Sequence, residues 1–434
     1  MTHYVSTRGD DQPCTFSAAM DRGLCTDGGL FVPESFPDRA PGAGPAQSLA
    51  ECAAQVIAPF FAGDPLAASL ADICTSALSF PVPLVPLVPV ERDAGATSSA
   101  AVLELFHGPT AAFKDVGARF MAECLTRHEA GGRDRTVLVA TSGDTGGAVA
   151  AAFWRRPGFE VVILFPSQGV SARQRHQLTC WGDNVHSFAV RGTFDDCQRL
   201  LKTALADPDW RARRRLTTAN SINIARLLPQ VVYYAFAGMC YLRDSGVAPD
   251  FIVPSGNVGN ATAALWAKRL GYPVGTVVLA TNANRAVPDY LVSGRWEPRP
   301  SRSTLANAMD VGNPSNMERV RHMYHDAASL SADVESVSVD DDAIRATIRR
   351  GVARWGRVWD PHTATAMHVL ERRDAAHQIA VATAHPAKFD TVVEPLVGRA
   401  VEVPADLASL LARPARAAEI EPDLGELSAV LASS

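Results

Sequence analysis

Short apolar runs alternate with helical segments along most of this chain, and that alternation limits the folds that are open to it. From about residue 100 onward, runs rich in β-branched residues recur, and a helical segment lies between most of them. The runs are AVLELF (101–106), RTVLVAT (135–141), EVVILFP (160–166), HSFAV (186–190), DFIVPS (250–255), GTVVLAT (275–281) and QIAVATA (378–384). This pattern predicts an α/β fold in which parallel sheets are covered by helices.

The two ends of the chain differ from this alternating region. Residues 1–90 are predicted to form a mostly helical unit that is interrupted by the proline- and glycine-rich segment FVPESFPDRAPGAGPAQ (31–47). The segment FPVPLVPLVPV (80–90) closes the unit as an extended connector, because repeated proline cannot continue a helix. The alanine-rich tail, 401–434, is expected to consist of terminal helices.

Length and charge exclude several classes of protein. The chain has 434 residues, of which 47% are hydrophobic and 20% are charged, and this is the composition of a globular protein of two or three domains. Its net charge of −5 argues against nucleic acid as a partner, and the one basic run, RARRR (211–215), is typical of a solvated helix face. The most apolar stretch, 227–242, is too short for a membrane span and contains Gln230.

The eight cysteines are scattered through the chain. They form no C-x-x-C pair and no metal-ligand spacing, so we expect reduced core thiols and no metal site. The first residues, MTHYVSTRGDDQPC, show neither the basic nor the apolar part of an export signal. These features predict a cytoplasmic protein.

Two segments of the alternating region share one plan. VLVATSGDTGGAVAAAFWRR (137–156) and DFIVPSGNVGNATAALWAKR (250–269) each contain a strand, then Ser-Gly-Asp/Asn-x-Gly, then an alanine-rich helix with a tryptophan and a basic end. Glycines at such a turn let several backbone N–H groups point at one position beside a helix N-terminus, which favours anion binding. Neither loop has the spacing G-x-x-x-x-G-K or G-x-G-x-x-G, so nucleotide-dependent enzymes are disfavoured.

Lysine is scarce in this chain, and one lysine stands in a conspicuous place. Only Lys114, Lys202, Lys268 and Lys388 occur, and Lys114 follows a glycine–proline turn in ELFHGPTAAFKDVGARF (104–120). An amine can lose its proton and attack a carbonyl, whereas a guanidinium cannot. Two anion-binding loops and one reactive amine suit pyridoxal phosphate acting on an amino acid.

At this point the sequence resembles the threonine synthase family, which are fold-type II pyridoxal-phosphate enzymes. The resemblance spans most of the chain, because several long motifs occur in the family's order. They are YVSTRG (4–9), FSAAMDRGLCTDGGLFVPE (16–34), FHGPTAAFKD (106–115), ATSGDTGGA (140–148), NSINIARLLPQ (220–230), PSGNVGNATA (254–263), DPHTATA (360–366) and ATAHPAKF (382–389).

The resemblance implies a role for each residue that matches a motif. Lys114 corresponds to the lysine that forms the Schiff base with the cofactor, and its place at a helix start should lower its pKa. The cofactor phosphate loop corresponds to Gly256, Asn257, Val258, Gly259 and Asn260, although relatives tend to have Phe and Asp in place of Val258 and Asn260. Thr383 corresponds to the partner of the pyridine nitrogen.

The substrate carboxylate loop corresponds to Ser142, Gly143, Asp144 and Thr145, with Asp144 near the cofactor's 3-oxygen. Candidate ligands of the substrate phosphate are Arg119, Arg226, His385 and Lys388.

The resemblance also implies an architecture and a reaction. We expect a large α/β domain (91–110 and 225–400) that carries the cofactor-phosphate loop, and a small α/β domain (111–224) that carries the lysine and the substrate loop. The implied reaction converts O-phospho-L-homoserine and water to L-threonine and phosphate, in a monomer or a homodimer.

Two alternatives stay open at this point. Val258, Asn260 and the segment ARQRHQL (172–178) leave room for a paralogue that acts on another γ-phosphorylated or phosphonate amino acid. A catalytically silent binding paralogue is the second alternative, and the intact Lys114 speaks against it.

Overall fold

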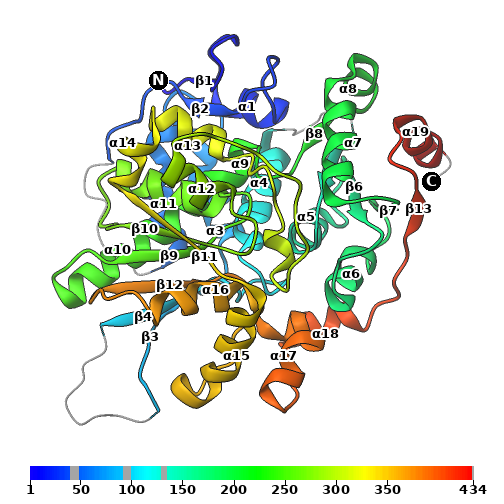
Figure 1. Ribbon diagram of the computed structural model, residues 1–434. Helices are drawn as coiled ribbons and strands as arrows, with labels where there is room; N and C mark the ends of the chain where they lie inside the picture. The colour runs from blue at the N-terminus through cyan, green and yellow to red at the C-terminus, as the bar shows by residue number, and fades with distance from the viewer. Residues whose placement is uncertain (40–47, 91–98, 129–133, 433–434) are drawn as a thin grey trace.

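Two separate sheets organise the computed structural model, which describes residues 1–39, 48–90, 99–128 and 134–432 (Figure 1). The larger sheet has the strand order β11-β10-β9-β12-β4-β3, and every neighbouring pair is parallel except β3 and β4. Its strands are β3 (Leu84–Pro86), β4 (Ala100–Glu104), β9 (Asp250–Pro254), β10 (Val277–Thr281), β11 (Val334–Ser338) and β12 (Gln378–Ala382). Helices α10 (Gln230–Ser245), α11 (Gly259–Arg269), α12 (Ala286–Ser293), α13 (Met317–Met323), α14 (Ala327–Ser331), α15 (Asp341–Trp355), α16 (Pro361–Leu370) and α17 (Asp390–Val397) accompany it.

The smaller sheet is entirely parallel, in the order β13-β7-β6-β5-β8. Its strands are β5 (Arg135–Ala140), β6 (Phe159–Pro166), β7 (Val185–Val190), β8 (Thr217–Thr218) and β13 (Ala418–Ile420). Helices α4 (Lys114–His128), α5 (Asp144–Phe153), α6 (Ala172–Thr179), α7 (Phe194–Ala206) and α8 (Pro208–Arg214) surround it, and α9 (Ile224–Leu227) leads back to the larger sheet. Each strand-like run predicted from the sequence overlaps one of these strands, so the predicted α/β fold with parallel sheets covered by helices is confirmed.

Strands β3, β8 and β11 are among those that lie where the sequence did not indicate a strand. Strand β11 is an edge strand with alternating exposed residues, which weakens its apolar signal. Strand β8 has two residues, which are too few to show a strand pattern in the sequence. Strand β3 lies inside the proline-rich connector, at the edge of the larger sheet, where a proline loses no required hydrogen bond.

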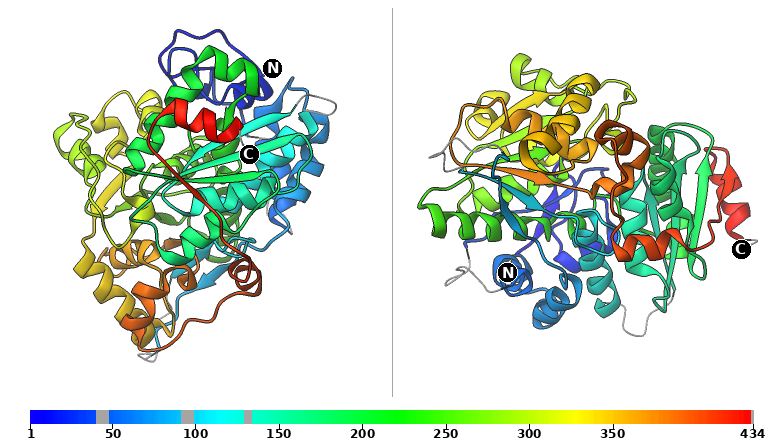
Figure 2. Two further views of the ribbon diagram at one scale, coloured as in Figure 1. Left: turned by 90° about the vertical axis from the view of Figure 1, so that its right-hand side faces the viewer. Right: turned by 90° about the horizontal axis from the view of Figure 1, so that it is seen from below.

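The C-terminal tail, 401–434, was expected to be helical, and this is wrong in part. It contains α18 (Ala405–Leu411) and α19 (Leu424–Ala432), but strand β13 lies between them and pairs in parallel with β7. Figures 1 and 2 show this segment, in red, passing along the outer side of the smaller sheet. Arg191, next to the end of β7, forms ion pairs with Glu419 and Glu421. A free sheet edge and these charges therefore determine a strand that local composition does not favour.

The N-terminal unit packs its helices against the larger body. It contains α1 (Phe16–Arg22), α2 (Leu49–Ile57), α3 (Leu70–Ala77), the 3-10 helices η1 (Ala58–Phe61) and η2 (Ala67–Ser69), and an antiparallel pair, β1 (Tyr4–Ser6) and β2 (Phe31–Pro33). Phe60 stacks on Trp266 of α11, with ring centroids 6.0 Å apart. The residues 40–47 of the proline- and glycine-rich segment and the expected domain boundary at residue 91 lie outside the described residues.

None of the described helices combines the length and the apolar character that a membrane crossing requires. All eight cysteines are free thiols, and six of them are buried.

Candidate active site

One pocket contains both glycine loops and Lys114. It opens at the carboxyl ends of β5 and β9, the edge of a parallel sheet where ligands bind in open α/β folds. Its lining consists of Phe113, Lys114, Ala140, Thr141, Ser142, Asp144, Thr145, Phe194, Asn220, Ser221, Gln230, Pro254, Ser255, Gly256, Asn257, Val258, Gly259, Asn260, Ala308, Met309, His362 and Thr383. The sequence-predicted loops, which are far apart in the chain, therefore meet at one site.

Lys114 is the first residue of α4, and short-range contacts shape the turn before it. Asp115 accepts hydrogen bonds from the backbone N–H of Thr110 (2.9 Å) and from its hydroxyl (2.7 Å). A Cβ atom on Gly108 would lie 2.5 Å from the Asp115 carboxylate, so only glycine fits there. The backbone N–H of Phe113 donates to the Thr383 carbonyl (2.9 Å), which brings the turn beside β12. The ammonium of Lys114 lies 4.2 Å from the centroid of the Phe113 ring.

Burial, and to a smaller extent the neighbouring Arg226 guanidinium, lowers the pKa of Lys114 to about 8, while Asp144 acts in the opposite direction. The sequence predicted this direction from the helix N-terminus, but burial is the main cause. Arg226 is 2% exposed, and its Nη1 donates to the Ala219 carbonyl. A lysine with this pKa is unprotonated far more often near neutral pH than an ordinary lysine, and the unprotonated amine is the nucleophile.

The first glycine loop (142–145) starts α5 and is held from two sides. The Thr141 hydroxyl accepts hydrogen bonds from the N–H groups of Gly143 and Gly146, each 3.0 Å long. Asp144 is buried, and the Lys388 ammonium lies 2.9 Å from its Oδ1. Burial alone would raise the pKa of Asp144, but Lys388 and His362 outweigh it, so the pKa is lowered and the carboxylate stays ionised.

The second glycine loop (256–260) starts α11, and Val258 caps that helix with φ of 62°. This left-handed conformation is strained for a β-branched residue. The Asn260 Oδ1 accepts hydrogen bonds from the hydroxyls of Tyr233 and Tyr234. The Asn257 Oδ1 accepts a hydrogen bond from the Ser315 N–H (3.3 Å).

This second loop fits a phosphate group. A Cβ on Gly256 would lie 2.7 Å from the Met309 Cα, so the backbone here approaches its neighbours too closely for any side chain. The buried Asn260 Nδ2 has no hydrogen-bond partner among the described residues, and the loop contains no carboxylate. N–H groups at the start of a helix together with a neutral amide suit a phosphate dianion. Thr383, in the same pocket, presents a hydroxyl that can meet a pyridine nitrogen.

Four basic residues were predicted to hold the substrate phosphate, and none of them lines the pocket. Arg119 donates to the carbonyls of Ser76 and Ala77, so it caps the end of α3. His385 accepts a hydrogen bond from the Ala387 N–H and lies in a different cleft, beside Glu104 and Arg357.

The other two predicted phosphate ligands are buried structural cations. Lys388 is 1% exposed, pairs with Asp144, and donates to the Thr110 carbonyl (2.7 Å). Arg226 packs closely against α4: a Cβ atom on Gly117 of that helix would lie only 2.9 Å from the Arg226 Nε. We therefore assign both residues to the support of the site instead of to phosphate contact.

The sequence reasoning missed His362. Its Nδ1 lies 2.9 Å from Asp360 Oδ1, and the Ala308 N–H donates to its Nε2 (3.1 Å). The motif DPHTATA contained this residue, but a single sequence does not show that a histidine of a helix start reaches the pocket.

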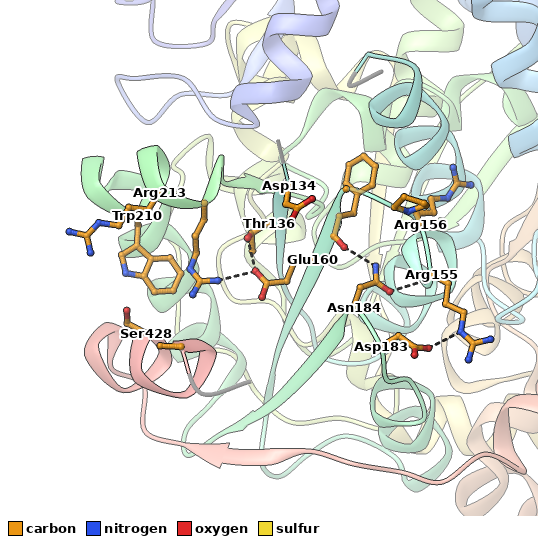
Figure 3. A pocket seen from close by; sticks show the side chains of 15 residues that line it. Asp134, Thr136, Arg155, Arg156, Glu160, Asp183, Asn184, Trp210, Arg213 and Ser428 are labelled. Atoms are coloured by element: carbon orange, nitrogen blue, oxygen red, sulfur yellow. Dashed lines mark hydrogen bonds and ion pairs between the residues drawn. The ribbon is translucent and has the colours of Figure 1, made fainter. Parts of the chain in front are cut away.

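A second, wider groove lies at the opposite edge of the smaller sheet (Figure 3). It runs over the amino ends of β5, β6 and β7, and several of its charged side chains pair with one another. Glu160 accepts hydrogen bonds from Thr136 and Arg214, and Arg155 pairs with Asp183. It contains neither glycine loop nor lysine, so we assign the chemistry to the first pocket.

The fold and the pocket define a fold-type II pyridoxal-phosphate-dependent enzyme, and the family model described as "Pyridoxal-phosphate dependent enzyme" matches residues 76–384. Models described as "Threonine synthase N terminus" and "Threonine synthase, C-terminal" match residues 3–78 and 363–431. The chain belongs to the threonine synthase family.

Individual relatives agree with this assignment. The chain is 37% identical over 411 residues to threonine synthase of Escherichia coli, with 92% of each chain covered, and 39% identical over 442 residues to that of Haemophilus influenzae, with 98% of each covered. It matches the crystal structure of the Escherichia coli enzyme with a TM-score of 0.89 at 35% identity, covering 99% of both chains. A pyridoxal-phosphate-bound threonine synthase from Brucella melitensis matches with a TM-score of 0.89 at 34% identity, again over 99% of both chains.

Proposed function

We propose that this enzyme converts O-phospho-L-homoserine and water to L-threonine and inorganic phosphate, with pyridoxal phosphate as its cofactor. The observation that carries the proposal is the meeting of Lys114 with both glycine loops in one pocket of a chain that matches threonine synthases along nearly its whole length. When bound, the cofactor supplies an electron-accepting ring that stabilises negative charge on the substrate's carbon atoms.

Different residues of the pocket have different roles in this reaction. The second glycine loop and the start of α11 would hold the cofactor phosphate through backbone N–H groups, and the Thr383 hydroxyl would face the ring nitrogen. The first glycine loop offers backbone N–H groups to the substrate α-carboxylate. Lys114 would be the residue that holds the cofactor, and its amine, whose pKa is lowered, would accept the proton from the substrate Cα.

The net reaction breaks the bond between Cγ and the phosphate oxygen, turns Cγ into a methyl group and places a hydroxyl from water on Cβ. Inorganic phosphate is the only other product. Of the basic side chains among the described pocket-lining residues, Lys114 is the one that remains to meet the leaving phosphate, because Asp360 and the Ala308 N–H engage both ring nitrogens of His362. We therefore place the substrate phosphate on the Lys114 side of the pocket.

The decisive experiment is an assay of the purified holoenzyme with O-phospho-L-homoserine, in which phosphate and threonine are measured together. Equal amounts of both products are expected. Phosphate release only from a different γ-phosphorylated amino acid, or turnover of a γ-phosphonate, would assign the chain to a paralogue with another substrate. A protein that binds cofactor but turns over none of them would be a silent paralogue.

Three further features belong to the same proposal. The large domain (91–110 and 225–400) and the small domain (111–224) each contain one sheet, apart from the edge strands β3 and β13, which is the support for this division. We place the enzyme in the cytoplasm, as its free thiols favour. We expect a monomer or a homodimer, which sedimentation of the purified protein distinguishes.

A further inference from the structure

Gln174, in the third position of α6, connects two parts of the site that are distant in the chain. It is 1% exposed, although it does not line the pocket. Its Nε2 donates to Asp144 Oδ1 (3.1 Å), and its Oε1 accepts a hydrogen bond from Asn307 Nδ2 (3.0 Å). One buried amide therefore donates a hydrogen bond to Asp144 and accepts one from Asn307.

The first of these partners belongs to the first glycine loop. A Cβ on Gly143 would lie 2.6 Å from the Gln174 Nε2, so the side-chain amide is in close contact with that loop. Asp144 needs two partners because it is buried, and Gln174 shares its Oδ1 with Lys388. Without Gln174, the ion pair with Lys388 would still keep the Asp144 carboxylate charged. The first glycine loop, however, would be less tightly oriented.

The second partner belongs to the 3-10 helix η3 (Asn307–Met309), which covers the second glycine loop. The Met309 Cα lies so close to Gly256 that no side chain fits between them. His362 holds the same turn from the other side, because the Ala308 N–H donates to its Nε2. A displacement of η3 would therefore loosen the cover of the second glycine loop.

Helix α6 is anchored before it reaches Gln174. Arg173 donates to the Ala387 carbonyl (2.5 Å) and forms an ion pair with Asp390 (3.3 Å), and the Ser171 hydroxyl donates to the Lys388 carbonyl (3.3 Å). These contacts join α6 to the segment after β12, so Gln174 is held in place by its own helix. A side chain that is fixed in this way can position others.

We propose that Gln174 is a positioning residue that couples the two glycine loops, so that the first loop grips the amino-acid carboxylate only while η3 is closed over the second loop. This inference rests on the proposed function, because it takes the first loop as the carboxylate site. It explains why part of the segment ARQRHQL, on a short polar helix, is buried: Gln174 faces the loops, whereas Arg175 is exposed enough for Nη1 to reach the Ser167 carbonyl near the surface.

The test compares Gln174→Met with Gln378→Met in the holoenzyme. Gln378 is a second buried glutamine, 3% exposed, whose Nε2 donates to backbone carbonyls at the amino end of β12, away from the site. For Gln174→Met we expect KM for O-phospho-L-homoserine to rise about tenfold or more while kcat changes less than about threefold. Binding of L-threonine to the holoenzyme, followed by the visible absorbance, should weaken by the same factor.

A double-mutant cycle with Asn307→Ala tests the coupling itself. If Gln174 acts through η3, the double variant is no worse than the more impaired single variant, whereas independent effects multiply. Wild-type KM and L-threonine affinity in Gln174→Met, an equal change in Gln378→Met, or multiplying effects in the cycle would each overturn the inference. Failure of the wild-type enzyme to form or bind threonine would instead overturn the proposed function, so the two failures are distinguishable.

Discussion

The two glycine loops are near-copies in sequence, yet they are built differently. The first loop starts its helix after Gly143, whose φ of 151° no other residue tolerates well, whereas the second starts after Val258 at 62°. The first contains an ionised, buried carboxylate, Asp144, neutralised by Lys388. The second contains the amide of Asn260, oriented by Tyr233 and Tyr234.

On the proposed assignment of the loops, this difference lets one motif serve two anions. In the first loop the charges of Asp144 and Lys388 cancel, so only backbone N–H groups are left to attract a ligand, which suits a carboxylate that arrives and leaves in each turnover. In the second loop no carboxylate opposes the helix N-terminus, which suits a phosphate dianion that stays bound. The sequence similarity of the two loops reflects the backbone turn that they share. The side chains around each loop determine which anion it suits.

The largest effect is expected at Lys114, which lines the same pocket as both loops. Lys114→Ala should remove covalent attachment of the cofactor and lower turnover by about 10⁴-fold or more, because no other group in the pocket offers both a nucleophile and a base. Borohydride reduction followed by mass spectrometry locates the attachment site. Lys268→Ala is the control, since Lys268 is paired with Asp333 outside the pocket. A label on Lys202, Lys268 or Lys388 would show that the assignment is wrong.

The charge difference between the loops should appear in the pH dependence of cofactor capture by the apoenzyme. The amine of Lys114 must be unprotonated to attack the aldehyde, so the capture rate should fall about tenfold per pH unit below its pKa of about 8. Asp144 raises that pKa, so Asp144→Asn should move the midpoint to lower pH. Stopped-flow absorbance measures both profiles, and a midpoint that moves upward in the variant would contradict the electrostatic role of Asp144.

Gly143→Ala should damage the first loop alone. The new Cβ would meet Gln174 at 2.6 Å and would force a disfavoured φ, so we expect a stability loss of roughly 1–3 kcal/mol and a KM increase of about tenfold. Gly147→Ala is the matched control on the same helix. Its nearest contact would be an ordinary 3.5 Å, so this variant should be neutral or slightly stabilising. Equal effects of the two changes in thermal unfolding and kinetics would argue against a special conformation at Gly143.

Asn257→Asp should affect the second loop alone. A negative charge beside the cofactor phosphate should weaken pyridoxal phosphate by about 1–3 kcal/mol. Pyridoxal, which lacks the phosphate, is the matched ligand and should bind with little change. Fluorescence titration of the apoenzyme measures both affinities. An unchanged affinity for pyridoxal phosphate would reverse the allocation of the two loops.

The smallest effect is expected for Val258→Gly. Loss of a buried side chain destabilises, but release of the left-handed strain stabilises, so the two should nearly cancel, to within about 1 kcal/mol. Val253→Gly is the comparison, because Val253 is buried in the regular strand β9 and has no strain to release. That variant should lose about 3 kcal/mol in denaturant unfolding. Equal losses at the two positions would show that Val258 is not strained.

What the sequence by itself determined is the part of the molecule that depends on neighbours along the chain. Strand, glycine turn and helix follow one another locally, and the turn before Lys114 is closed by Asp115 and Thr110, five residues apart. Hydrophobic period, glycine and helix-start chemistry act over such short spans, so the α/β fold, the two glycine loops and the helix that begins at Lys114 were all predictable.

Only the tertiary structure decided which distant side chains meet. Lys388 stands in a motif of the expected family, but its ammonium turned out to be buried against Asp144 and the Thr110 carbonyl, 278 residues away. Gln174 meets Asn307 across 133 residues, and strand β13 exists because β7 leaves an edge to pair with. The physical reason is that a buried charge or amide must find its partner wherever the packed chain brings one, and no local pattern encodes that partner.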